Sequence, residues 1–166
     1  MTWVTDRIAV GGGIWTGEKM AQVAGAGITH IIDMQIEFDD TALAEPHGVQ
    51  VLWNPTDDDF QAKGPEVFQH AVDFALQALN GEAGSPERAA VARAGVQGNG
   101  HRLFIHCAAG VHRAPMMTLA ILRVLGFPLP EAMELIESRR PVVDFAGVYV
   151  RSVENFIRAY QSAAAK

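Results

Sequence analysis

The chain has 166 residues, of which 49% are apolar, so it is long enough for one domain, residues 1–166, with a sizeable core and too short for two. Its formal charge of -6 comes without a run of Lys or Arg to offset it. This balance argues against nucleic acid or an anionic membrane surface as a partner.

The first part of the chain predicts a strand, a helix and a second strand. Residues 4–12, VTDRIAVGG, are typical of a short edge strand that ends at successive glycines. A helix over residues 17–26 follows, and Gly27 ends it. The β-branched run ITHIID, residues 28–33, is expected to form a buried parallel strand that ends at Asp33.

A polar segment then leads to a third strand and an acidic loop. We expect residues 35–48 to cross the surface before the strand VQVLW, residues 49–53, which Pro55 ends. The loop that follows, residues 54–65, holds three consecutive aspartates.

The next predicted helix, residues 66–79, has one apolar face, formed by Phe68, Val72, Ala75 and Leu79. Residues 81–101 are rich in Gly and Ala, and a short helix over 86–94 fits the Ser-Pro-Glu sequence at its start. We interpret 81–101 as an insertion before the central strand, with no chemistry of its own.

The central stretch, residues 102–126, predicts a strand, a tight turn and a helix. RLFIHC forms the strand. Four small residues follow, and among them Gly110 can adopt a positive φ. Pro115 fits the first turn of the helix. Cys107 therefore lies between a strand and a helix amino terminus, six residues before Arg113.

Two more helices are predicted, one from Pro130 to about Arg139 and one over residues 147–163. Because strands alternate with helices early and helices cluster late, we predict an α/β fold. Its central, mostly parallel sheet would have four to five strands flanked by helices. The carboxyl ends of three strands would meet at one edge, where open sheets bind ligands. Asp33, the acidic loop and Cys107 gather at this edge.

No stretch of the sequence has the pattern of a targeting signal or a membrane span. The first ten residues lack a basic region followed by a long apolar run. The apolar run 114–125 is too short to cross a bilayer, and Arg123 interrupts it. We therefore expect a cytoplasmic protein with no membrane partner.

The turn after Cys107 has the features of a binding site for a phosphate-sized anion. Unpaired N–H groups and the dipole of the following helix favour such a ligand. The amides that would hold it belong to Ala108, Ala109, Gly110, Val111, His112 and Arg113. The same field favours the nucleophilic thiolate of Cys107, and the planar fork of Arg113 could bind two ligand oxygens. A lone cysteine can also be a small buried apolar residue, but this loop favours a nucleophile.

His106-Cys107, five residues and then Arg113 resemble the signature loop of the cysteine-based protein tyrosine phosphatases, and the short chain resembles their dual-specificity branch. The strand before the motif and the helix after it supply the context that makes the motif specific. Two further patterns of this branch are present, FxxAxxF at Phe68-Ala71-Phe74 and the late Arg140-Pro141. The resemblance implies phosphomonoester hydrolysis through a phosphocysteine intermediate on Cys107, without a cofactor.

The resemblance also implies an aspartic acid on an upstream loop, which protonates the leaving group and later activates water. Asp57, Asp58 and Asp59 are the candidates. The spacing of ten residues to Phe68 selects Asp58. Because the three are neighbours, Asp57 and Asp59 stay open as alternatives.

Two histidines flank the nucleophile. His106 resembles the histidine that precedes the cysteine in this family, where it orients the loop and favours the thiolate by hydrogen bonding. His112 would lie at the rim, near the substrate or facing solvent. Together with Cys107 they could indicate a metal site, but a second Cys or a paired His is missing, so we predict no metal.

Ala114 departs from the family pattern, in which a Ser or Thr follows the arginine and supports the thiolate as a leaving group. The phosphatases of regenerating liver are similar in having Ala-Pro at this point, and as a group they are slow enzymes. We therefore expect breakdown of the phosphocysteine to limit turnover.

The loop sequence AAGVH has no lysine, unlike the loop of phosphoinositide-selective relatives. No extra amino-terminal segment long enough to build a deep phosphotyrosine pocket is visible. We therefore expect a shallow site for phosphotyrosine, and also phosphoserine or phosphothreonine, in proteins, or for a small phosphomonoester. We also expect a monomer. Two alternatives remain. One is a catalytically weak phosphate-binding module, favoured by Ala114, and the other is a persulfide-carrying sulfurtransferase, which also places a cysteine in an anion-binding loop.

Overall fold

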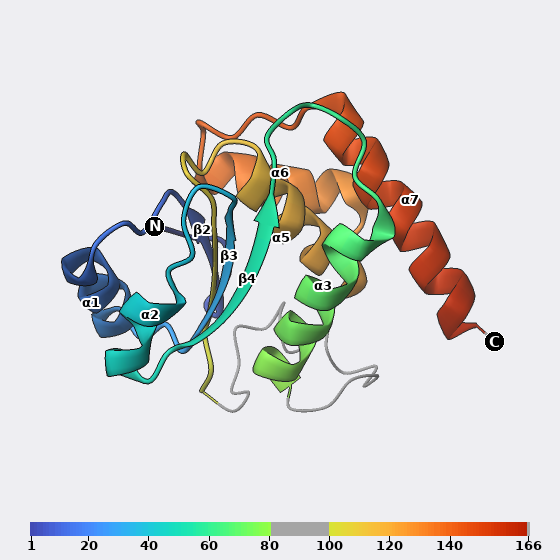
Figure 1. Cartoon of the computed structure of the whole chain (residues 1–166). Helices are drawn as coiled ribbons and strands as arrows, with labels where there is room; N and C mark the ends of the chain where they lie inside the picture. The colour runs from blue at the N-terminus through green and yellow to red at the C-terminus, as the bar shows by residue number, and fades with distance from the viewer. Residues whose placement is uncertain (81–99, 166) are drawn as a thin grey trace.

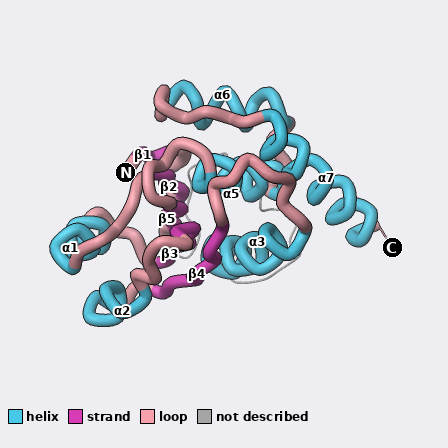
Figure 2. Tube along the Cα trace, turned by 45° about the horizontal axis from the view of Figure 1, so that its top comes forward, coloured by secondary structure: helices cyan, strands magenta, loops and turns pink. Residues whose placement is uncertain are grey.

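The computed structural model describes residues 1–80 and 100–165, and a five-stranded sheet forms its centre (Figures 1 and 2). The strands lie in the order β1 (Thr2–Trp3), β2 (Ile8–Gly11), β5 (Leu103–His106), β3 (His30–Gln35) and β4 (Gln50–Thr56). All neighbours are parallel except β1, which is antiparallel to β2. The predicted α/β fold with a mostly parallel sheet is confirmed.

Two of the predicted strands differ from the structure, one in its position in the sheet and one in where it ends. The prediction of an edge strand over residues 4–12 is wrong, because β1 covers the outer side of β2 and every residue of β2 is buried. The prediction that Pro55 ends its strand is also wrong, because β4 continues to Thr56. Proline is tolerated in β4 because the strand lies at the sheet edge, and Pro55 falls where the register with β3 shifts, between Trp53 and Thr56.

Helices cover both faces of the sheet. On one side lie α1 (Gly17–Gly25), α2 (Thr41–Ala44) and the short 3-10 helix η1 (Glu45–His47), and on the other lie α3 (Pro65–Asn80), α5 (Arg113–Val124), α6 (Leu129–Arg139) and α7 (Gly147–Ala164) (Figure 2). Successive strand residues alternate between the two cores, as Ile31 and Phe104 face the first side and Ile32 and Ile105 the second. Both faces are therefore buried, as parallel sheets require.

The predicted surface segment 35–48 is more folded than expected. It contains α2 and η1, and Asp40 and Ala44 within it are buried. The apolar face of α3 is confirmed, since Phe68, Val72, Ala75 and Leu79 are all buried. The short helix predicted over 86–94 lies outside the described residues.

The central helix α5 begins directly behind the carboxyl end of β5, and ten of its residues, Arg113–Leu122, are buried. The ends of β3, β4 and β5 lie at the same side of the molecule, where α5 and α7 also begin (Figure 1). This arrangement brings the predicted site residues to one edge. None of the described helices is both long and apolar enough to span a membrane.

Candidate active site

Cys107 directly follows the central strand β5, and its sulfur faces backbone amides. The Sγ atom accepts hydrogen bonds from the N–H of Gly110 and of Ala114, each at 3.3 Å. The residue is only 2% exposed. Although Cys107 touches the apolar core, its sulfur is held by donors in the turn that leads into α5, as the sequence predicts.

The carbonyl groups of the turn are all drawn outward. The carbonyl of Ala108 accepts from the N–H of Gly13 at 3.0 Å, and that of Val111 accepts from the N–H of Asp144 at 3.0 Å. Between them, Arg140 donates from Nη2 to Ala109 at 3.2 Å and from Nε to Gly110 at 2.9 Å. In a trans peptide the next N–H points opposite to the carbonyl. The amides of residues 109–112 therefore face inward, and within the described residues those of Ala109, Val111 and His112 have no hydrogen-bond acceptor.

Gly110 is needed for this geometry. Its φ is +68°, and a Cβ atom there would lie 2.5 Å from the carbonyl carbon of Gly11. The side chain of Arg140 passes the same position and also donates to Thr2 Oγ1 at 3.1 Å. Arg140 thus fixes the turn from outside.

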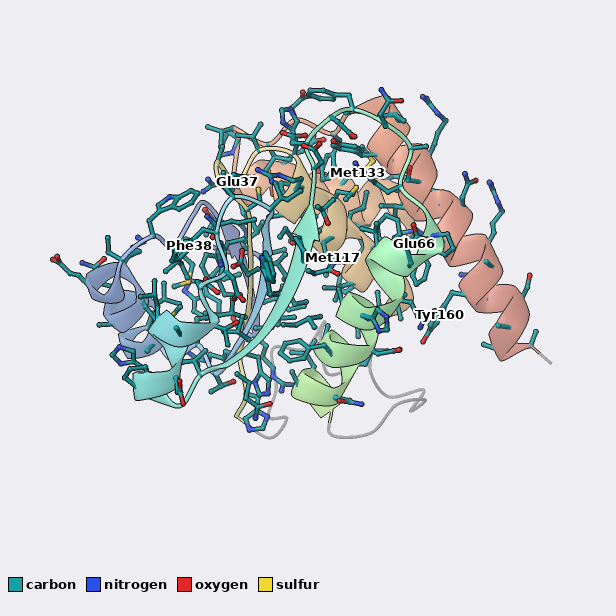
Figure 3. All side chains as sticks on the ribbon, in the orientation of Figure 1. Glu37, Phe38, Glu66, Met117, Met133 and Tyr160 are labelled. Carbon is teal, nitrogen blue, oxygen red and sulfur yellow. The ribbon has the colours of Figure 1, made fainter. Side chains whose placement is uncertain are left out.

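Arg113 is buried, with 5% exposure, and points back to the strand edge. Its Nη1 and Nη2 bind the two carboxylate oxygens of Glu37, at 2.5 and 3.1 Å, and Nη1 also donates to the carbonyl of Thr56 at 2.9 Å. Glu37 lies beyond the end of β3 (Figure 3). The remaining donor, Nε, is buried and has no hydrogen-bond acceptor among the described residues.

The electrostatics of this pair follow from its contacts. Burial alone lowers the pKa of the Arg113 guanidinium, but the hydrogen bonds of Glu37 and the charges of Cys107, Glu37 and Asp58 outweigh it, so the pKa is raised. The hydrogen bonds from Arg113 lower the pKa of Glu37. Arg113 is therefore a permanent cation beside Cys107.

The structure separates the three candidate aspartates. Asp58 lies beside the turn, with Oδ2 3.0 Å from Nδ1 of His112. Asp59 is exposed and pairs with Lys63 at 2.6 Å, a contact that lowers the pKa of Asp59. Asp57 is exposed as well. Of the three, Asp58 is the one in contact with a residue of the turn.

His106 lies in a buried acidic cluster instead of contacting the turn through its ring. Its Nε2 is 2.7 Å from Oδ2 of Asp40 and 3.7 Å from Oδ1 of Asp33, and its Nδ1 has no partner among the described residues. One ligand atom from each of the three side chains lies within 4.8 Å of the others, a separation compatible with a metal ion. This group is not predictable from spacing, because Asp33 and Asp40 lie more than 60 residues before His106 in the sequence.

Asp33 has an unusual protonation in this cluster. Its oxygens accept from the N–H of Gln35 at 2.8 Å and of Asp40 at 3.1 Å, yet burial first and the charge of Asp40 second raise the pKa of Asp33 to about 8. The folded chain therefore keeps a proton in the cluster at neutral pH. A shared proton is the simplest way for two buried carboxyl groups to lie in contact.

Asp33→Asn should remove a pH dependence of stability. Because the pKa of Asp33 is about 8 in the folded chain against 3.8 ordinarily, the unfolded chain alone releases this proton between those values. The free energy of unfolding then falls as pH rises from about 4 to about 8, by up to ~1.4 kcal/mol per pH unit for one proton. Urea unfolding across this range should show a flatter slope for Asp33→Asn. Asp73→Asn, on the exposed side of α3, is the control, and an unchanged slope in Asp33→Asn would contradict the assignment.

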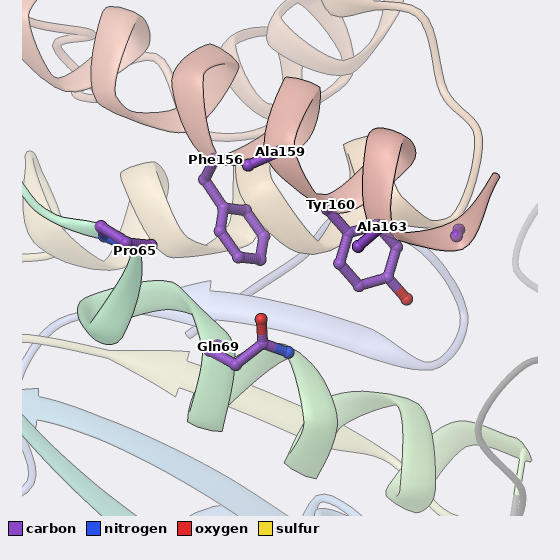
Figure 4. A pocket seen from close by; sticks show the side chains of 7 residues that line it. Pro65, Gln69, Phe156, Ala159, Tyr160 and Ala163 are labelled. Atoms are coloured by element: carbon purple, nitrogen blue, oxygen red, sulfur yellow. The ribbon is translucent and has the colours of Figure 1, made fainter. Parts of the chain in front are cut away.

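A separate groove of about 380 Å³ lies between the start of α3 and the end of α7 (Figure 4). Pro65 and Gln69 line one side of it, and Phe156 and Tyr160 line the other. None of the predicted site residues lines this groove, so it is distinct from the turn at Cys107.

Three residues that contact the site in the structure were not predicted from the sequence to do so. Glu37 falls in the predicted surface segment, Tyr149 falls in a predicted helix, and Arg140 belongs to an Arg-Pro pattern, so the sequence assigns none of them a contact in the site. Glu37 could have been noticed as an acidic residue just beyond a strand end at the ligand-binding edge. No local signal marks Tyr149, whose partner lies 91 residues away.

Comparisons with known proteins bear on the family and the fold of the chain. No family model matches the chain. In sequence it is 26% identical over 133 residues to "Dual specificity protein phosphatase 5" of Rattus norvegicus, covering 80% of this chain and 29% of the length of that protein.

Among solved structures it is similar to PTPMT1 in complex with PI(5)P, with a TM-score of 0.75, 18% identity, and 97% and 96% of the two chains covered. It is also similar to human DUSP28, with a TM-score of 0.73, 20% identity, and 98% and 99% covered. The predicted resemblance to the dual-specificity phosphatases is confirmed.

Proposed function

Since the chain has the fold of the dual-specificity phosphatases, we propose that it hydrolyses phosphomonoesters through a phosphocysteine intermediate. The Cys107 thiolate attacks phosphorus while the ester oxygen leaves with a proton from Asp58. A water molecule, deprotonated by the Asp58 carboxylate, then attacks the phosphocysteine. Phosphate leaves, the thiolate of Cys107 re-forms and Asp58 regains its proton.

The observation that carries this proposal is the set of unused donors around the sulfur. Several amides of the turn face inward without an acceptor among the described residues. Nε of Arg113 is also left without one, because the two Nη atoms bind Glu37 and Thr56. Nε of Arg113 is buried, and a buried donor without an acceptor is costly, so its position is expected where a ligand supplies the acceptor. The equatorial oxygens of a phosphoryl group would meet the turn amides and the free edge of Arg113.

Proteins carrying phosphotyrosine, and also phosphoserine or phosphothreonine, are the substrates we propose. Phe60 is half exposed beside the turn, and its ring meets the ring of His112 edge-on at 4.9 Å. An aromatic side chain at this place suits a phenolic ester, and the turn carries no lysine for a second phosphate.

Trapping of the intermediate tests the function. After rapid acid quenching during turnover of a phosphotyrosine peptide, mass spectrometry should find one phosphoryl group on the peptide that contains Cys107. Parallel assays with phosphothreonine peptides and a phosphoinositide would define the substrate class. Turnover without a Cys107 adduct would contradict the mechanism, and phosphate binding without turnover would favour the phosphate-binding module instead.

Ala114→Ser should speed the steady state. The amide of Ala114 contacts the sulfur, but the residue offers no hydroxyl to the departing thiolate. One hydrogen bond to a charged sulfur is worth ~1.5 kcal/mol, which corresponds to a roughly tenfold faster breakdown of the phosphocysteine. Stopped-flow assays of p-nitrophenyl phosphate should show a burst followed by a slow phase in the wild-type chain, and a faster slow phase in the variant. An unchanged slow phase would contradict this, provided that both chains melt at the same temperature.

A further inference from the structure

Both carboxylate oxygens of Asp58 are held by side chains from other parts of the fold. Oδ1 accepts a hydrogen bond from the hydroxyl of Tyr149, in α7, at 2.9 Å. Oδ2 lies 3.0 Å from Nδ1 of His112, the last residue of the turn before α5. The carboxyl group of a loop residue is thus fixed in position and in rotation.

Tyr149 can act here only as a donor to Asp58. It is 1% exposed, and the N–H of Phe60 donates to its oxygen at 3.1 Å, so its own hydrogen is free for the carboxylate. Burial first, and then the hydrogen bond and charge of Asp58, raise the pKa of Tyr149 to about 12. The phenol therefore stays protonated at any pH at which the chain would work.

His112 links Asp58 to a third loop. Its Nε2 lies 3.1 Å from Oδ2 of Asp144, whose carboxylate is largely exposed. The backbone of Asp144 also donates to the carbonyl of Val111, which holds this loop against the turn. The His112 ring therefore lies between the carboxyl groups of Asp58 and Asp144, with one ring nitrogen in contact with each.

Phe60 reinforces the arrangement from the acidic loop. Its φ of 56° is unusual for a residue other than glycine, and such backbone strain persists only where the surroundings hold it. The ring stacks on Tyr149, with centroids 5.8 Å apart and planes 7° apart. The loop beside Asp58 is therefore fixed by the same residue that binds the carboxylate.

We propose that His112 and Tyr149 are positioning residues that hold Asp58 and its proton where the leaving group forms. This role rests on the proposed function. It applies to the first chemical step, because a leaving oxygen of high basicity needs a proton in the transition state whereas one of low basicity does not. Loss of either contact should therefore matter in proportion to the basicity of the leaving group.

The test is kcat/KM, which reports the steps up to the phosphocysteine, for phenyl phosphate and for 2,4-dinitrophenyl phosphate. Tyr149→Phe and His112→Ala should lower it about 10- to 100-fold for phenyl phosphate, and by less than about threefold for the dinitrophenyl ester. Asp58→Asn should show the same pattern, with a loss of roughly 10²–10⁴ for phenyl phosphate. His112→Asn, whose side-chain amide group can replace Nδ1 but has no counterpart of Nε2, should recover part of the loss.

Two matched controls separate this role from general damage. Tyr160→Phe removes a hydroxyl from the same helix away from Asp58, and Asp59→Asn removes the neighbouring carboxylate. Both should leave the ratio of the two substrates unchanged. Equal losses for both esters in Tyr149→Phe and His112→Ala, or no loss at all, would overturn the positioning role. If the wild-type chain turned over neither ester, the proposed function would fail, and this role with it.

Discussion

Cys107→Ser should abolish phosphatase activity, with kcat/KM for p-nitrophenyl phosphate reduced on the order of 10⁴-fold or more. A serine hydroxyl at this place is a poor nucleophile because no side chain of the described residues contacts the sulfur as a base, and the turn offers it only N–H donors. The thiolate needs no such base, since those donors stabilise its charge directly. Steady-state kinetics with enzyme at high concentration would measure the residual rate.

The variant should keep the binding site that surrounds the residue. The outward carbonyls, Arg140 and Gly110 are untouched, so the melting temperature and the affinity for inorganic phosphate should change little. Retained turnover in Cys107→Ser would exclude the phosphocysteine route. Loss of both turnover and phosphate binding would show that the sulfur shapes the turn itself.

Arg113→Lys should lower kcat/KM by roughly 10³–10⁵, the range seen when a cation that stabilises a transferring phosphoryl group is lost. Two nitrogens of Arg113, Nη1 and Nη2, bind the carboxylate of Glu37, and the third, Nε, is left for a ligand. A lysine has one nitrogen and cannot serve both. We expect the loss with good and poor leaving groups alike, because the arginine binds the transferred group and not the departing oxygen.

Arg123→Lys is the matched control, since Arg123 lies on the same helix and pairs with Glu154 away from the turn. It should retain full activity. If Arg113→Lys also retained it, the guanidinium would serve only to neutralise Glu37. A selective loss with poor leaving groups would instead assign Arg113 to the same step as Asp58.

The turn at Cys107 could be predicted from sequence because its determinants are local. A short apolar strand, small residues with one glycine at positive φ, and an apolar helix place Cys107 and Arg113 six positions apart on one loop. The two cores could be predicted as well, since alternating strand residues and the face of α3 follow simple periodicities. Strand order could not, so the position of β2 inside the sheet was missed.

The contacts that orient the site residues were not predictable, because they join distant positions. Glu37 and Arg113 are 76 residues apart, and Asp58 and Tyr149 are 91 apart. No periodicity or motif spacing carries information over such distances. The aspartate triplet illustrates the limit, since spacing could favour Asp58 but only the fold separates it from Asp59, whose side chain turns to Lys63.

The sulfur of Cys107 is the single thiol of this chain. If peroxide converts it to a sulfenic acid, no resolving cysteine within the chain can capture that product as a disulfide. Oxidation would then inactivate the site. Recovery would depend on a small thiol reaching the sulfur of Cys107, a residue that is only 2% exposed.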